Sequence, residues 1–159
     1  MRITRESFTT TYDKYKNTVY SVIFNYVRNA EDSSDLTQDA FVKLLESGID
    51  YESDDHLKAW LIRVAINLSK NHLKFSSKFS DEEVPELPYY DKHGDEQDIL
   101  SAVMQLPEKY RVPLHLFYYE DYPVARIARM LGRRESTVRS DLHRGRLLLE
   151  KRLRGAKTE

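Results

Sequence analysis

The chain has 159 residues, enough for one ordinary domain or two small ones, and its formal net charge is only −1. It contains no cysteine, which excludes disulfides and thiolate metal sites, and no apolar run approaches the roughly 18 residues needed to cross a bilayer. The opening MRITRESFTT lacks the apolar centre of a signal peptide, so we expect a cytoplasmic protein without membrane insertion.

Three helices are expected in the first half of the chain. Apolar residues recur at steps of three and four from Phe8 to Val27, which predicts a helix over residues 7–28. Asn29 is suited to cap a second helix that ends near residue 47, before Gly48. Its expected buried stripe is Leu36, Ala40, Phe41, Leu44 and Leu45. Ser53 is suited to cap a third helix over residues 54–74.

The segment that follows has a different composition. Eight acidic residues, two prolines and a glycine lie within residues 76–98, and the helical periodicity is lost. This predicts a flexible acidic linker over residues 76–95 between a domain at 1–75 and another at 96–159.

Helical patterns return in the last third of the chain. Residues 99–106 are periodic, and Pro107 opens a further helix in which Pro113 predicts a kink or a late start, because an interior proline costs about 3 kcal/mol. The segment PVARIARML predicts a short helix before a turn at Gly132, and a long helix is expected over residues 136–153. No strand pattern occurs, so the expected fold is all-α with two small helical domains.

The end of the chain has the spacing of a helix-turn-helix. Ala128, Gly132 and Val138 provide the small residue at the helix crossing, the turn residue and the branched anchor of the second helix. Residues 122–159 carry 11 basic and 4 acidic groups, which favours contact with a polyanion. The expected exposed face presents donors suited to a DNA major groove.

The motif LPEKYRVPLHLFYYEDYPVARIARMLGRRESTVRSDLHRGRLLLEKRL resembles the C-terminal domain of an extracytoplasmic-function (ECF) sigma factor. The resemblance implies that this domain reads the minus-35 promoter element, with Arg133 and Arg134 near the DNA backbone. The implied contacts are Arg133, Arg134, Thr137, Arg139, Ser140, His143 and Arg144. The family usually has an apolar residue and then a small polar N-cap in place of Arg133 and Arg134, and often a basic residue in place of Asp141.

Two motifs in the first half resemble the same family. DSSDLTQDAFVKLLE is similar to its polymerase-binding helix, which implies that Asp35, Gln38 and Asp39 dock on core RNA polymerase. HLKAWLIRVAINLSKNHLK is similar to its promoter-melting helix. The resemblance implies minus-10 contacts by Trp60, Arg63, Asn67, Lys70 and Lys74, although periodicity alone favours a core position for Trp60. We expect a base pocket in the preceding loop GIDYESDD, because a base extruded from the duplex must be captured.

The resemblance implies a sigma factor whose partners are the beta and beta-prime subunits of core polymerase, promoter DNA and an anti-sigma factor. A stand-alone helix-turn-helix regulator is the alternative, and a nucleic-acid enzyme is a distant third.

No catalytic arrangement, metal site or cofactor motif is recognisable, since the five histidines include no i,i+4 pair. The linker is either a plain spacer or, as the resemblance implies, a strand that imitates nascent RNA inside the polymerase.

Overall fold

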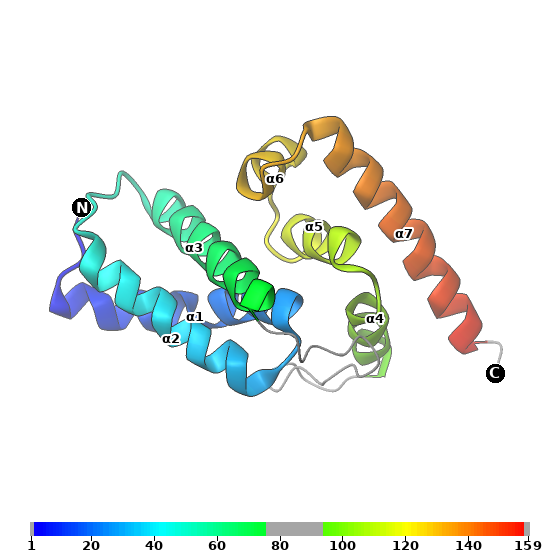
Figure 1. Ribbon diagram of the computed structural model, residues 1–159, viewed down its shortest axis with the longest axis horizontal. Coiled ribbons are helices and arrows are strands. Elements are labelled where there is room, and N and C mark those ends of the chain that lie inside the picture. Colours follow the sequence, from blue (N-terminus) through cyan, green and yellow to red (C-terminus); the bar gives the residue numbers. More distant parts are fainter. Residues whose placement is uncertain (1, 76–93, 158–159) are drawn as a thin grey trace. The chain divides into compact units, whose positions relative to one another are not determined.

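The computed structural model describes residues 2–75 and 94–157, and it is helical throughout these ranges apart from short connections (Figure 1). No strand occurs in the described residues, which confirms the all-α expectation. The chain divides into two compact units, residues 1–79 and 80–159. The expected linker lies outside the described residues, except that residues 94 and 95 already belong to a helix.

The first unit consists of α1 (Arg5–Val27), α2 (Ala30–Ser47) and α3 (Asp54–Phe75). The Asn29 side chain accepts a hydrogen bond from the backbone N–H of Asp32 at 2.8 Å, and Gly48 ends α2 at a φ of 61°. Ser53 Oγ accepts one from the N–H of His56 at 3.1 Å. The expected caps of α2 and α3 are therefore confirmed.

The apolar core of this unit lies where α1 packs on both α2 and α3. Val19, Ile23 and Phe24 of α1 are completely buried, as is Ile62 of α3. In α2 and α3 the buried residues lie on one face, so the opposite face of each of these two helices remains available for other molecules.

One expected core residue of α2 is exposed instead. Leu44 is buried, whereas the neighbouring Leu45 is 53% exposed, so the expectation that both belong to the buried stripe is wrong for Leu45. Successive residues are about 100° apart around a helix, and only Leu44 lies on the side that faces α1 and α3.

The second unit consists of α4 (Gly94–Met104), α5 (Glu108–Tyr118), α6 (Val124–Leu131) and α7 (Glu135–Lys157). Helix α5 begins directly after Pro107, its N-cap, so the late start that Pro113 suggested does not occur. Proline has no N–H to donate to the carbonyl four residues earlier, which in α5 is that of Lys109.

Helices α5 and α7 approach closely at Gly145. A Cβ atom on this glycine would lie 3.0 Å from Leu114 Cδ1 and 3.2 Å from Tyr110 Cβ. Glycine inside a helix costs roughly 1 kcal/mol relative to alanine. Here it allows two helices to pack at a distance that a larger residue would prevent.

We predict that Gly145→Val destabilises the second unit by about 1–3 kcal/mol, because the added methyl groups overpack the α5–α7 contact. Urea unfolding followed by circular dichroism detects both units, whereas the fluorescence of the single tryptophan, Trp60, reports on the first unit alone.

The matched control is Gly155→Val, since a Cβ at Gly155 meets nothing within 4 Å. The control variant should unfold at the same urea concentration as the unaltered chain. In both variants the urea midpoint followed by Trp60 fluorescence should be unchanged. Equal stability of the two variants would contradict the close-packing argument.

Candidate nucleic-acid interface

The expected helix-turn-helix is formed by α6, a turn at Gly132 and α7. Gly132 has a φ of 66°, and its N–H and that of Arg133 both donate to the carbonyl oxygen of Ala128. Val138 is completely buried and Leu142 is 2% exposed, so these two side chains anchor the first half of α7. Their burial fixes which face of α7 points outward.

Six of the seven residues expected at the minus-35 element are exposed. They are Arg134, Thr137, Arg139, Ser140, His143 and Arg144. Nη2 of Arg139 lies 3.5 Å from Oε2 of Glu135, a pair in which both side chains are more than half exposed. Such a surface pair is weak, so it leaves Arg139 able to exchange the carboxylate for a DNA acceptor.

Arg133 is placed differently from these six. Its side chain is only 21% exposed, and its Nη1 lies 3.3 Å from Oδ2 of Asp141. The same nitrogen donates to the carbonyl oxygen of Lys109 at 3.1 Å. The structure therefore directs this guanidinium toward α5 and the inner side of α7.

The residues expected at the minus-10 element form a polar stripe on α3. Arg63, Asn67, Lys70 and Lys74 are all exposed, at successive steps of four, three and four residues. Cations suit DNA phosphates, and the Asn67 amide offers both a donor and an acceptor to a base.

Trp60 is half-buried in an aromatic cluster at the start of α3. Its ring packs edge-on against Tyr51 at 6.2 Å between centroids, and Tyr51 also contacts His56. The Tyr51 hydroxyl lies 3.3 Å from Ser47 Oγ, and burial raises the pKa of this phenol. The loop in which a base pocket was expected is thus joined to Trp60 through Tyr51.

The residues expected to bind polymerase lie on the outer face of α2. Asp35, Gln38 and Asp39 are exposed, and two apolar side chains continue the same face, Val42 at 49% and Leu45 at 53% exposure. Sequence reasoning missed this apolar extension. The signal was an excess of apolar residues in α2 over what one helical face can bury.

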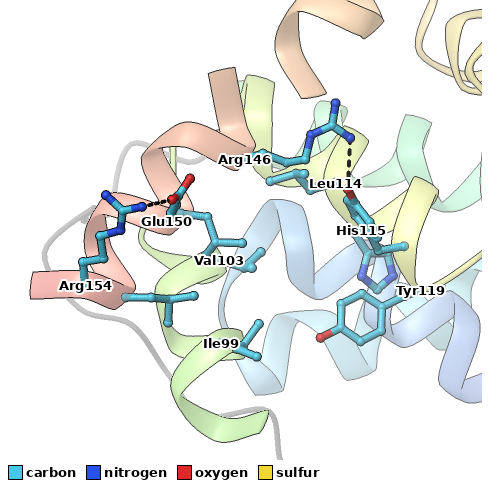
Figure 2. A pocket seen from close by; sticks show the side chains of 11 residues that line it. Ile99, Val103, Leu114, His115, Tyr119, Arg146, Glu150 and Arg154 are labelled. Atoms are coloured by element: carbon cyan, nitrogen blue, oxygen red, sulfur yellow. Dashed lines mark hydrogen bonds and ion pairs between the residues drawn. The ribbon is translucent and has the colours of Figure 1, made fainter. Parts of the chain in front are cut away.

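A groove in the second unit was also missed. It has a volume of about 530 Å³ and lies between α4, α5 and α7. Figure 2 shows the His115 and Tyr119 rings at one end and the Glu150–Arg154 ion pair at another. Leu149 is only half-buried because it lines this open space. The groove can accept apolar side chains of another molecule.

His115 is the one strongly shifted titratable group at this groove. Its side chain is 5% exposed, it stacks on Tyr119, and burial lowers the pKa of the imidazole to about 4. Oε1 of Glu120 lies 3.9 Å from Nε2, too far for a hydrogen bond. The imidazole is therefore neutral near pH 7.

Within residues 2–75 and 94–157, no group of three or more His, Cys, Asp or Glu side chains is placed to hold a metal ion. None of the helices in these ranges is both long enough and apolar enough to cross a bilayer.

Two family models match the chain. The model described as "Sigma-70 region 2" matches residues 11–79, and the one described as "Sigma-70, region 4" matches residues 96–149. The region 2 match includes the outer faces of α2 and α3, and the region 4 match includes the helix-turn-helix.

Curated relatives are similar over most of their length. RNA polymerase sigma factor SigV of Bacillus subtilis is 27% identical, over 85% of this chain and 84% of that protein. RNA polymerase sigma-H factor of Pseudomonas aeruginosa is 28% identical, over 88% and 82%. ECF RNA polymerase sigma factor SigW of Bacillus subtilis is 24% identical, over 94% and 90%.

Among solved structures, the fold is similar to that of the sigma factor RpoE from Bartonella quintana, determined in complex with the anti-sigma factor NepR. The TM-score is 0.75 at 20% sequence identity, over 94% of this chain and 98% of that one. The exposed polar faces of α3 and α7 each lie inside a sigma-70 region, and the two regions together define a transcription initiation factor. The chain belongs to the sigma-70 family, and within it to the ECF sigma factors.

The buried imidazole predicts a pH dependence of stability. The pKa of His115 is about 4 when folded and about 6.5 when unfolded, so between these values the unfolded chain binds a proton that the folded chain excludes. The free energy of unfolding should therefore fall as pH drops from 6.5 toward 4, by roughly 3 kcal/mol from this group.

This prediction is checked by urea unfolding of the unaltered chain and His115→Gln at several pH values. The free energy of unfolding of the variant should lack this part of the fall with pH, because the variant has no imidazole at position 115. Parallel curves for the two proteins would show that His115 is not responsible.

Proposed function

We propose that this chain binds core RNA polymerase, directs it to specific promoters and helps to open the DNA there. The observation that best supports this proposal is that the family models of sigma-70 region 2 and region 4 both match this chain, region 2 before region 4. A stand-alone helix-turn-helix regulator would need only the second of them. The chain is a transcription initiation factor, and we assign bond formation to the polymerase.

The proposed division of labour follows the two halves of the chain. Residues 1–75 bind polymerase and engage the minus-10 element, and residues 96–159 read the minus-35 element. In the second half Arg134 lies near the DNA backbone, and the readers are the other five exposed residues of the helix-turn-helix, Thr137, Arg139, Ser140, His143 and Arg144. Arg139 is the main reader, because its guanidinium can donate two hydrogen bonds to a guanine. The stripe on α3 serves the minus-10 element.

Opening DNA requires that an unstacked base be captured, since unstacking costs a few kcal/mol. The half-buried Trp60 ring offers a surface for such a base, and its contact with Tyr51 connects it to the preceding loop. Arg63, Lys70 and Lys74 would hold the adjacent phosphates.

The docking surface for core polymerase is the outer face of α2. Asp35, Gln38 and Asp39 supply its polar part, as the resemblance implies, and Val42 and Leu45 supply an apolar part. Exposed leucine and valine next to polar groups are typical of a surface that a protein partner covers.

The other partners follow from the same proposal. We propose that the chain acts in the bacterial cytoplasm, because promoter DNA and RNA polymerase are found there. RpoE of Bartonella quintana was solved with an anti-sigma factor. We include an anti-sigma factor among the partners of this chain, with the role of keeping it from the polymerase.

Transcription in vitro tests the proposal. The purified chain is added to bacterial core polymerase on a pool of random promoter sequences, and the RNA products are sequenced. The proposal expects RNA from templates that share two short sequence elements. If no template gives RNA above the level of core polymerase alone, the proposal fails.

Two substitutions on α2 should weaken polymerase binding without changing promoter preference. Gln38→Ala removes a polar contact, and Leu45→Ala removes apolar surface worth about 1–2 kcal/mol, roughly five- to thirtyfold in affinity. Titration of labelled core polymerase measures this loss. An unchanged affinity in both variants would remove α2 from the docking surface.

Arg139→Ala should have the opposite effect. It should cost roughly 1–3 kcal/mol in discrimination between a selected promoter and one altered in the minus-35 element. Its affinity for core polymerase should stay unchanged, so each set of variants is the control for the other. Undiminished minus-35 preference would mean that α7 is not the reading helix.

A further inference from the structure

Arg133 and Asp141, two positions at which the family usually has other residue types, lie where α5 meets α7. Pro113 cannot donate to the carbonyl of Lys109, and a carbonyl inside a helix needs a donor. Nη1 of Arg133 donates to this oxygen at 3.1 Å and lies 3.3 Å from Oδ2 of Asp141. One nitrogen with two hydrogens therefore joins the backbone of α5 to a side chain of α7.

Asp141 is unusual on a helix that meets DNA, because a carboxylate repels phosphates. Its side chain is only 11% exposed and is turned toward Arg133, away from the exposed residues Arg139 and Ser140. A carboxylate buried to this extent needs a cation and a hydrogen-bond donor, and Arg133 supplies both.

We propose that Arg133 and Asp141 form a latch that fixes the position of α7 on α5. In this proposal Arg133 is a positioning residue and makes no phosphate contact. The latch spans the part of α7 from which the minus-35 readers project. Val138 and Leu142 anchor the same part through apolar packing, which resists sliding of a helix less than a directional hydrogen bond does. The inference rests on the proposed function.

A phosphate contact and a latch differ in their dependence on salt. Each lost phosphate contact lowers the slope of log affinity against log salt concentration by about 1. Loss of a latch leaves the number of phosphate contacts unchanged and instead misplaces the readers. The slope and the minus-35 discrimination therefore separate the two roles.

The experiment uses the full chain with core polymerase and measures affinity for a selected promoter and for its minus-35 variant at several salt concentrations. Arg133→Ala should lower discrimination about tenfold and keep the slope. Asp141→Ala should have the same effect, and the double variant should be no worse than either single one. The exposed neighbour is the control, since Arg134→Ala should lower the slope and keep discrimination.

Arg133→Lys keeps the positive charge and guards against misfolding of the alanine variants. Lysine can replace arginine at a phosphate, but its side chain is one bond shorter and lacks the planar fork that serves both acceptors. The latch therefore predicts reduced discrimination with an unchanged slope for this variant. Circular dichroism establishes that each variant is folded.

Several outcomes would overturn the latch. They are a lower slope in Arg133→Ala, full discrimination in Arg133→Lys, or additive effects of the two alanine substitutions. If the unaltered chain and the folded variants distinguish the selected promoter from its minus-35 variant equally well, the latch proposal fails and the proposed function stands. If the unaltered chain shows no discrimination with core polymerase, the proposed function fails and the latch with it.

Discussion

The rotation of α7 about its own axis is the constraint on which the proposed promoter reading depends. Side chains can meet base edges only if one face of the helix is held toward the DNA, and a rotation by one residue, about 100°, would replace that face entirely. Val138 and Leu142 hold the helix by burial, and Gly145 allows it to lie close against α5. All proposed minus-35 contacts follow from this packing.

The first unit divides the surfaces of its helices in the same way. In α2 the inner face supplies Ala40, Phe41 and Leu44 to the apolar core, and the outer face offers both acidic and apolar groups to a partner. In α3 the inner face buries Leu61 and Ile62, and the outer face is polar. A small domain of three helices can in this way have two binding surfaces without losing its core.

Local signals were sufficient to predict most of the fold. The caps at Asn29 and Ser53 and the turn glycines at positions 48 and 132 act on neighbouring residues, so the ends of helices could be placed from sequence. The exposed face of α7 followed from its apolar period. These features depend on spacings of a few residues.

Features that depend on contacts between distant residues were not predicted. Leu44 and Leu45 both fit an apolar stripe, and only the packing of three helices leaves Leu45 outside. Arg133 was expected to lie near the DNA backbone like Arg134. Nothing in the neighbouring sequence indicates that its guanidinium bonds to the carbonyl of Lys109, 24 positions earlier, and to the carboxylate of Asp141, eight positions later. The groove beside His115 needs three separate helices.

The central claim is that the chain distinguishes promoters only as part of the polymerase. The most direct measurement compares the affinity of the chain alone, and of the chain with core polymerase, for a selected promoter duplex and a scrambled one at the same salt concentration. The account predicts no preference for the chain alone and at least a tenfold preference with core polymerase. Strong preference by the chain alone would contradict it and identify a stand-alone regulator instead.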